Sequence, residues 1–127
     1  MTSIEVPFSI AAALPTLSVI DVTNEVAHEI TQARPRDGIA YISPGGGPWV
    51  VRVQERESGF FCDVEEMLKR LVPLETGDRE RMLLALLGPR TEAVPFARGR
   101  LCLGTWQKIL MVGFNSTAAE WSCTILG

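Results

Sequence analysis

The chain has 127 residues, 46% of them hydrophobic, which fits one domain with a sizeable core. Its 12 basic and 15 acidic residues give a formal net charge of −3, and the arginines are too scattered in sequence for a nucleic-acid footprint. No apolar run approaches the roughly 18 residues of a membrane span, and no basic residue precedes the apolar stretch 10–14 as a secretory signal requires. We therefore predict a single cytoplasmic domain over residues 1–127, with no nucleic-acid or membrane partner.

The cysteine pattern also favours a reducing compartment. Cys62, Cys102 and Cys123 are widely spaced and form no CxxC pair, so free thiols are the simplest interpretation. A disulfide or a thiolate metal site is the alternative.

Two strands and a helix are predicted first. Residues 4–10 alternate apolar and polar side chains, and a short strand covers 17–20. A helix follows, with Asp21 or Thr23 as its candidate cap. Its apolar stripe comprises Val22, Val26, Ile30 and Ala33. His28, the only histidine, faces away from this stripe, which predicts an exposed side chain rather than a metal ligand.

A glycine-rich loop separates two predicted strands at 39–43 and 49–54. The loop reads Pro44-Gly45-Gly46-Gly47-Pro48. Its backbone N–H groups can meet a phosphate, but the Lys-Ser/Thr pair and the following helix of a nucleotide-hydrolase phosphate loop are absent. A wide hairpin turn is therefore the preferred interpretation.

Two further helices are predicted between residues 63 and 87. Asp63 and Glu66 have the spacing of a capping box, and Pro73 ends that helix. Asp78 can cap the next helix, and Gly88-Pro89 ends it. The predicted buried residues are Val64, Met67, Leu68 and Leu71 in the first helix, and Met82, Leu83, Leu86 and Leu87 in the second.

The last third of the chain is predicted to be β-structure. The segments are a strand near 93–96, a turn at Arg98-Gly99, a strand at 101–103, a kink, a long strand at 106–114, a turn at 115–117 and a strand at 121–126. Along 106–114 both alternating faces are largely apolar, which predicts cover on both sides by a second sheet, by helices or by a neighbouring subunit. The mixed order of helices and antiparallel hairpins predicts an α+β fold.

Several distinctive phrases run along nearly the whole chain. They occupy residues 21–26, 63–64, 70–73, 86–89, 99–101, 103–107 and 124–127. The most specific is Gly104-Thr105-Trp106-Gln107. In order and position these phrases resemble the YjbQ-like family of bacterial and archaeal proteins, which are sometimes called secondary thiamine-phosphate synthases.

The resemblance implies a compact antiparallel β-sandwich with flanking helices that assembles as a homotrimer. It also implies a pocket between subunits, built from histidines, a glutamate and an arginine, for a metal ion and an anionic or phosphorylated small molecule. A weak thiamine-phosphate-forming activity is attributed to the family.

This chain departs from the family at the positions that would carry that chemistry. A histidine phrase of the family falls at Gly45 and Gly46, its glutamate falls at Gln54, and a helix-opening histidine falls at Arg81. Segment 73–78 is too short for a second histidine loop. A divalent ion needs about three or four lone-pair donors. We therefore predict a divergent member that lacks the family's histidines, with a degenerate site and no bound metal or cofactor.

Two functions remain, and the sequence leaves open whether the protein is an enzyme. The preferred one is a non-catalytic trimeric scaffold or small-ligand-binding protein. The alternative is an enzyme related to secondary thiamine-phosphate synthase that acts on a phosphorylated small molecule without a metal, or with metal donors placed elsewhere. The candidate pocket comprises Gly45, Gly46, Gln54, Arg81 and Gln107, and no residue is assigned as catalytic. In this pocket Arg81 would grip phosphate oxygens and the glycine amides would add donors.

Two residues of the most specific phrase also have plain structural interpretations. Trp106 is predicted to be a core or interface anchor rather than a stacking platform, and Gln107 is predicted to satisfy backbone groups at the bend before the long strand.

Overall fold

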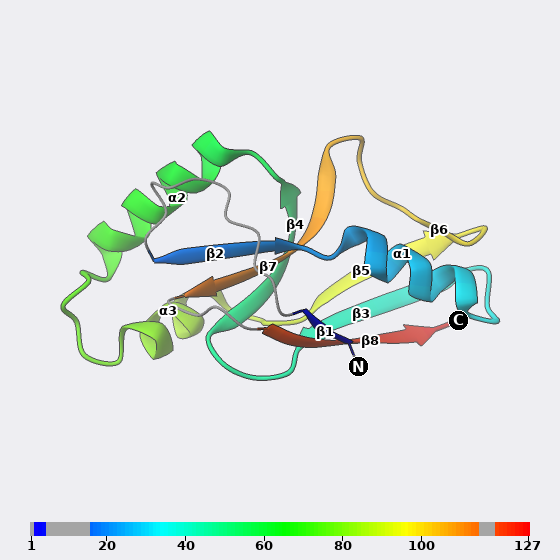
Figure 1. Ribbon diagram of the computed structural model, residues 1–127, viewed down its shortest axis with the longest axis horizontal. Helices are drawn as coiled ribbons and strands as arrows, with labels where there is room; N and C mark the ends of the chain where they lie inside the picture. Colours follow the sequence, from blue (N-terminus) through cyan, green and yellow to red (C-terminus); the bar gives the residue numbers. More distant parts are fainter. Residues whose placement is uncertain (1, 5–15, 115–118) are drawn as a thin grey trace.

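The computed structural model of the chain describes residues 2–4, 16–114 and 119–127, within which three helices and eight strands form (Figure 1). The helices are α1 (Thr23–Gln32), α2 (Ser58–Leu71) and α3 (Arg79–Leu87). The strands are β1 (Thr2–Ile4), β2 (Leu17–Asp21), β3 (Gly38–Pro44), β4 (Trp49–Glu55), β5 (Glu92–Ala97), β6 (Arg100–Leu101), β7 (Gln107–Phe114) and β8 (Ala119–Leu126). No helix in these ranges has the length and apolar character needed to cross a membrane.

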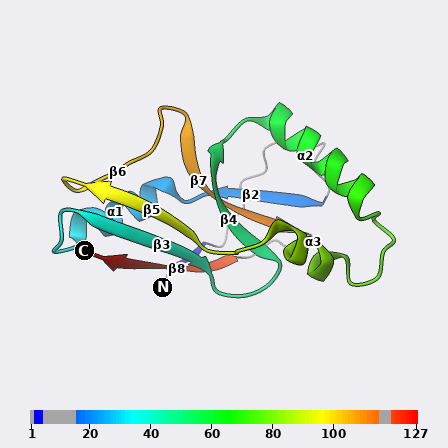
Figure 2. The ribbon, with the colours of Figure 1, turned by 180° about the vertical axis from the view of Figure 1, so that it is seen from behind.

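The strands form two antiparallel sheets. One has five strands in the order β1-β8-β3-β5-β6, and the other has three in the order β2-β7-β4. Figure 2 shows α2 and α3 together at one end of the molecule and the larger, five-stranded sheet at the other. The prediction of an α+β fold with antiparallel sheets and flanking helices is therefore confirmed.

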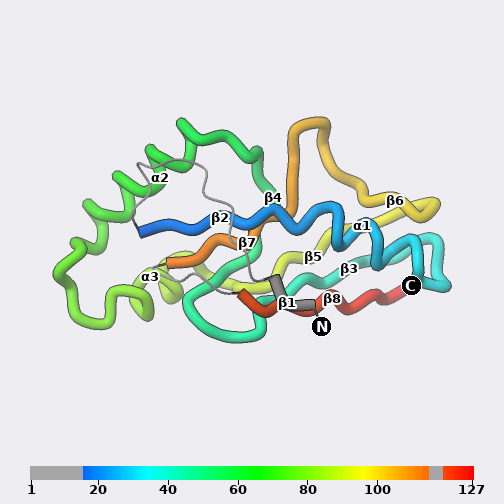
Figure 3. The backbone as a smooth tube through the Cα atoms, in the orientation of Figure 1, coloured from blue at the N-terminus to red at the C-terminus, as the bar shows by residue number. Residues whose placement is uncertain are grey.

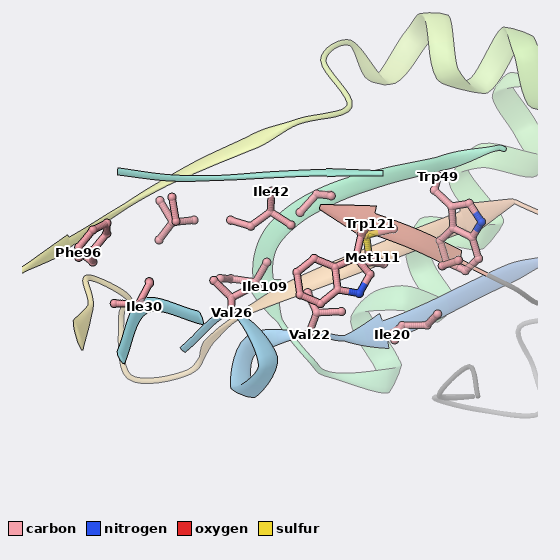
Figure 4. Packing of buried hydrophobic residues seen from close by; sticks show 14 residues of the cluster. Ile20, Val22, Val26, Ile30, Ile42, Trp49, Phe96, Ile109, Met111 and Trp121 are labelled. Carbon is pink, nitrogen blue, oxygen red and sulfur yellow. The ribbon is translucent and has the colours of Figure 1, made fainter. Parts of the chain in front are cut away.

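Strand β7 is the centre of the smaller sheet and is buried on both faces. Ile109 and Met111 lie in a core formed with the larger sheet and α1, which Figure 4 shows from close by. Leu110, Val112 and Phe114 lie in a second core with the buried residues of α2 and α3. The predicted cover on both faces is confirmed. The chain supplies both layers itself, so these two faces do not require a neighbouring subunit.

The phrase around residues 100–107 does not fold as a pair of neighbouring strands. Strand β6 ends at Leu101, two residues earlier than predicted, and lies at the edge of the larger sheet. Residues 102–106 then carry the chain across to β7 in the smaller sheet, as Figure 3 shows. The kink is thus a crossover between the two layers.

Helix α1 follows the prediction closely. Val22, Val26 and Ile30 are buried, and His28 is exposed. The N-cap residue is Val22 rather than the predicted Asp21 or Thr23, and no side chain caps the helix. The Asp21 carboxylate accepts hydrogen bonds from the backbone N–H and the hydroxyl of Thr23, at 3.0 and 2.6 Å, and so fixes the entry into the helix.

Helix α2 begins five residues before the predicted start. Its cap is Glu57, whose carboxylate accepts from the N–H groups of Gly59 and Phe60 at 2.9 and 2.6 Å. These are two of the amides that the first helical turn leaves without an intrahelical partner. The predicted capping box at Asp63 and Glu66 is therefore wrong, because both residues lie inside the helix.

The buried face of α2 also differs from the predicted one. Phe61, Glu65 and Leu68 are buried, whereas Met67 and Leu71 are 51% and 62% exposed. The helix has two neighbouring apolar stripes, and the smaller sheet packs against the one that contains Phe61.

Fewer side chains of helix α3 are buried than predicted. Leu83 is buried, but Met82 and Leu86 are 46% and 60% exposed. Asp78 precedes the helix with a positive φ of 56° and makes no side-chain cap, while Gly88 ends it with a φ of 74°.

The first predicted strand and the turn before the last one lie partly outside the described residues. Strand β1 overlaps the predicted strand only at Ile4, and residues 5–10 and the turn at 115–117 are not described. Strand β8 begins at Ala119, two residues before the predicted start.

Candidate functional site

An apolar hollow of about 220 Å³ lies between α2 and the face of the smaller sheet. It is lined by Val50, Arg52, Val53, Gln54, Phe60, Phe61, Val64, Met67, Leu68, Leu87, Val112 and Phe114. The hollow exists because α2 packs through Phe61 and Leu68, which leaves the side of the helix that bears Phe60 and Met67 at its rim. We call this space the α2 hollow.

The α2 hollow has little polar character of its own. The guanidinium of Arg52 donates to the carbonyls of Val51 and Pro89, at 2.7 and 2.8 Å, and also to that of Leu87. It therefore holds the end of α3 and the residues after it against β4. Gln54 uses its Oε1 to accept from the N–H of Glu55 at 3.0 Å, so its Nε2 is the group that the wall can offer to a ligand.

The two predicted glycines lie at the opposite end of β4 from Gln54. Gly45 donates its N–H to the carbonyl of Glu120 at 2.6 Å, which fixes the β3–β4 loop to β8. Gly46 is exposed, and a Cβ on it would meet nothing within 4 Å. At ~3.3 Å per strand residue, the five steps from Trp49 to Gln54 span roughly 16 Å. Within one chain the loop and Gln54 are therefore well separated.

Gln107 and Gln54 lie on neighbouring strands but point to opposite faces. Gln54 pairs with Lys108, and Gln107 pairs with Glu55. Because successive strand residues alternate, side chains one register step apart leave the sheet on different sides. The structure thus brings these two residues near in backbone position without aiming them at one space.

Gln107 has the structural role predicted for it. Its Oε1 accepts from the N–H of Gly104 at 2.7 Å and closes the bend before β7. Trp106 lies in that bend and is 72% exposed, so the prediction of a core anchor is wrong. The interface anchor stays a prediction, and the stacking platform stays its alternative.

Arg81 lies in the first turn of α3 and is exposed. It lines neither the α2 hollow nor the glycine loop. The predicted pocket residues therefore occupy three separate regions of the single chain.

Helix α2 contains a buried carboxylate that was not predicted from the sequence. Glu65 is 1% exposed, and its Oε1 accepts from both the N–H, at 2.8 Å, and the hydroxyl of Thr16. Its Oε2 has no hydrogen-bond partner among the described residues. Arg79 is nearly buried and donates through Nε to the carbonyl of Val72 at 2.8 Å, which closes the end of α2. Both residues stabilise the helical layer.

The titratable groups do not converge on one point. Among the described residues, no three His, Cys, Asp or Glu side chains are placed to hold a metal ion. Burial raises the pKa of the half-buried Cys123 thiol, and the nearby Glu29 carboxylate raises it further. Cys123 is therefore a protonated packing residue at neutral pH.

The family assignment follows from comparison of the whole chain with known proteins. A family model described as "UPF0047 protein YjbQ-like" matches residues 13–127. The chain belongs to the YjbQ-like UPF0047 family. A UPF0047 protein of Archaeoglobus fulgidus is 31% identical over 107 residues, which cover 78% of this chain and 82% of the relative. A UPF0047 protein of Methanothermobacter thermautotrophicus is 28% identical, over 73% of this chain and 71% of the relative.

Solved structures share the fold at lower sequence identity. A YjbQ/UPF0047-family protein described as uncharacterised, from Clostridium acetobutylicum, superposes with a TM-score of 0.80 at 19% identity, covering 99% of this chain and 100% of that one. A hypothetical protein from Aeropyrum pernix K1 gives a TM-score of 0.77 at 22% identity, covering 99% and 96%. The UPF0047 fold therefore extends over nearly the whole chain.

Proposed function

We propose that this UPF0047 protein is a non-catalytic trimeric scaffold that binds a small ligand in the α2 hollow, between neighbouring subunits. The observation that carries the proposal is the rim of the hollow. Phe60 and Met67 line it, yet they are 40% and 51% exposed in the single chain. An apolar hollow with an open apolar rim is complete only when another surface covers it.

The rim continues into a larger apolar surface. Phe60, Met67 and Leu71 follow one another at helical spacing along α2, and Leu74 lies just beyond the helix. Met82 and Leu86 add two exposed apolar side chains on α3. Apolar surface of this extent on a small domain marks an interaction site. A neighbouring subunit placed on α2 would bury the stripe and close the hollow together.

The chemistry of the hollow favours binding over catalysis. Its polar contribution is the Gln54 amide, because Arg52 is already bonded to carbonyls. An amide orients a ligand by hydrogen bonds but does not exchange protons near neutral pH. The positions that match the family's metal site offer glycine, amide and guanidinium groups, which supply no lone-pair donor set for a divalent ion. These features support a degenerate site.

Native mass spectrometry at micromolar concentration tests the assembly. We expect three copies per particle, and a clean monomer would remove the proposal. Elemental analysis of the same sample tests the degenerate site, for which stoichiometric zinc is the contradicting result.

An apolar fluorescent probe, 1-anilinonaphthalene-8-sulfonate, tests the hollow itself. We expect saturable binding to the wild type and none to Val64→Trp, which fills the hollow from its lining. Glu66→Trp, on the exposed side of the same helix, is the matched control and keeps the binding. Equal binding by all three proteins would contradict a ligand in the α2 hollow.

The enzyme alternative has its own test. The protein is treated with a chelator and assayed for thiamine-phosphate formation, beside the variant Arg81→Ala. Turnover in the wild type that the variant lacks would contradict the non-catalytic scaffold and support a metal-independent enzyme. We expect no turnover in either protein.

A further inference from the structure

The fold gathers four arginines at the end of the molecule opposite to α2 and α3. Arg34 and Arg36 follow the end of α1, and Arg98 and Arg100 belong to the β5–β6 hairpin. Figure 1 shows the last turn of α1, the α1–β3 loop and this hairpin side by side, and Figure 2 shows the same from behind. They surround an open hollow of about 550 Å³, lined by Ile30, Thr31, Ala33, Arg34, Pro35, Arg36, Arg98, Gly99 and Arg100. We call it the arginine hollow.

Hydrogen bonds hold the two segments of the arginine hollow in a fixed relation. Arg36 donates from Nη2 to the carbonyl of Arg98 at 3.0 Å, and Gly99 donates its N–H to the carbonyl of Arg36 at 2.9 Å. Arg98 also donates its N–H to the Asp37 carboxylate at 2.8 Å. The hairpin turn has φ of 54° at Arg98 and 74° at Gly99, the left-handed values of a tight two-residue turn. The side chains thus project from a built scaffold rather than from a loose loop.

The charge of the arginine hollow is strongly positive although the chain is acidic overall. Four of the chain's 12 basic residues line it, and no acidic residue does. None of the four guanidinium groups forms a salt bridge with a carboxylate among the described residues. The opposing charges include Asp37 beside the hairpin, the carboxylate of Gly127, which packs against Pro35 and Asp37, and the end of α1, whose dipole contributes about half a negative charge. Together they are fewer than the four guanidinium charges.

Elsewhere in the described chain, several arginines serve the fold directly. Arg52, Arg79 and Arg90 donate to backbone carbonyls and fasten one element to another. Arg34 and Arg100 instead stand exposed at the arginine hollow. Like charges that line one hollow without a carboxylate partner repel one another and raise the free energy of the folded state, so a bound anion would stabilise them.

We infer that the arginine hollow binds the phosphate or diphosphate group of a small phosphorylated molecule. Guanidinium groups fork onto phosphate oxygens with paired charge-assisted hydrogen bonds. The volume lies within the range of small-ligand sites. The lining supplies four arginines from two short segments, which suits one or two phosphate groups better than the long backbone of a nucleic acid. The inference does not depend on the α2 hollow or on trimer formation.

Isothermal titration calorimetry with sodium phosphate and sodium diphosphate at low ionic strength tests the inference. We expect saturable binding, tighter for diphosphate, that weakens as sodium chloride is raised because salt screens the charges. The double variant Arg34→Gln/Arg100→Gln should bind diphosphate about tenfold more weakly or worse. It keeps the Arg36 contacts that join loop to hairpin.

The matched control is Lys69→Gln/Arg70→Gln on α2, which removes the same charge far from the arginine hollow. We expect it to bind as the wild type does. Equal weakening in both double variants would reduce the effect to net charge and overturn the site. So would the absence of saturable binding to the wild type.

A measurement on the wild type alone covers the case in which the variant does not fold. Amide resonances of Arg36 and Gly99 should shift on addition of diphosphate, while those of α2 stay fixed. Shifts confined to α2 and α3 would contradict the inference. A single-stranded RNA that binds more tightly than diphosphate and displaces it would contradict the choice of a small ligand.

Discussion

Glu65 is a buried carboxylate whose partner lies 49 residues earlier in the chain. It joins α2 to the start of β2 through two hydrogen bonds from Thr16. We expect Glu65→Ala to lower the free energy of unfolding by about 2–3 kcal/mol, since both Thr16 donors lose their acceptor and a buried side chain is removed. Urea unfolding measures this change.

Glu66→Ala is the control for that measurement. Glu66 is exposed and pairs with Lys69 at 3.2 Å on the helix surface. Such a pair contributes less than about 1 kcal/mol. Equal losses from the two variants would contradict the structural role given to Glu65.

Cys123 makes the folded state sensitive to alkaline pH. Because burial and the Glu29 carboxylate raise the pKa of its thiol, the native chain keeps a proton that the unfolded chain releases. The resulting stabilisation is complete below the ordinary thiol pKa of about 8.5 and is lost as the pH rises through the folded pKa. We expect Cys123→Ser to lose less stability between pH 8 and pH 10.5 than the wild type does.

The exposed Cys102 provides the comparison for Cys123. Urea unfolding of Cys102→Ser should follow the wild type across the same pH range. An alkaline loss that is the same in Cys123→Ser and in the wild type would show that other groups cause it.

For single residues, the sequence predicted side-chain roles that depend on neighbouring residues in the chain, but not roles that depend on distant segments. His28 and Gln107 were predicted correctly because their environments depend on a helical angle and on a bend four residues long. Glu65 and Arg79 have charged side chains in helical segments, which ordinarily face water. Their burial depends on contacts with distant segments or with the end of a preceding helix, which no local pattern records.

Among the elements, the contact between β7 and β4 depends on one glycine. Gly113 pairs with Trp49, and a Cβ at Gly113 would lie 2.6 Å from the indole ring. Gly113→Ala must therefore displace a side chain that is 1% exposed. We expect a loss of about 2–3 kcal/mol in the free energy of unfolding.

Gly77→Ala is the matched substitution for Gly113→Ala. A Cβ on Gly77 would meet nothing within 4 Å, so the unfolding free energy should change by less than about 0.5 kcal/mol. If Gly113→Ala behaved like Gly77→Ala, the proposed packing of Trp49 over the glycine would be wrong.

Strand prediction succeeded better than the prediction of helix faces. The alternation assigns the apolar residues of β4 and those from Ile109 to Phe114 to the correct core, since a strand offers only two faces, and it fails at Trp106, which precedes β7 and is exposed. Helix α2 carries two adjacent apolar stripes, about one residue apart in rotation, so periodicity alone could not choose between them. Packing against the smaller sheet determines which stripe is buried, and it is the stripe that contains Phe61.

For the whole molecule, the exposed stripe of α2 leads to a prediction about assembly. Met67→Glu/Leu71→Glu places two carboxylates on residues that are 51% and 62% exposed, so the single chain should still fold. We expect the particle to dissociate into monomers, because each carboxylate would have to be desolvated in the proposed interface. Native mass spectrometry measures the copy number, and circular dichroism checks the fold.

Asn24→Glu/Gln32→Glu adds the same two charges on the exposed side of α1 and serves as the control. It should remain assembled. Persistence of trimers in the α2 variant would place the interface elsewhere on the molecule.

The candidate site at this scale was only partly predictable. The family phrases, Gln54 and the doubly covered strand could be found in the sequence. The arginine hollow could not, because Arg36 and Arg98 lie 62 residues apart in the sequence. They meet only when β3 pairs with β5 and so places the loop before β3 beside the hairpin after β5.

The crossover at residues 102–106 has a consequence for how the molecule folds. The smaller sheet needs β7 between β2 and β4, and Leu17 in β2 pairs with Phe114 in β7. A growing chain on the ribosome therefore cannot complete the smaller sheet until almost all of its residues have been made. Pairings so distant in sequence slow folding, because the chain must close a long loop before any contact compensates for the entropy lost. Until β7 has been synthesised, the apolar strands β2 and β4 have unpaired backbone groups along their edges. Unpaired apolar strands aggregate readily, so newly made chains need protection from aggregation during this time.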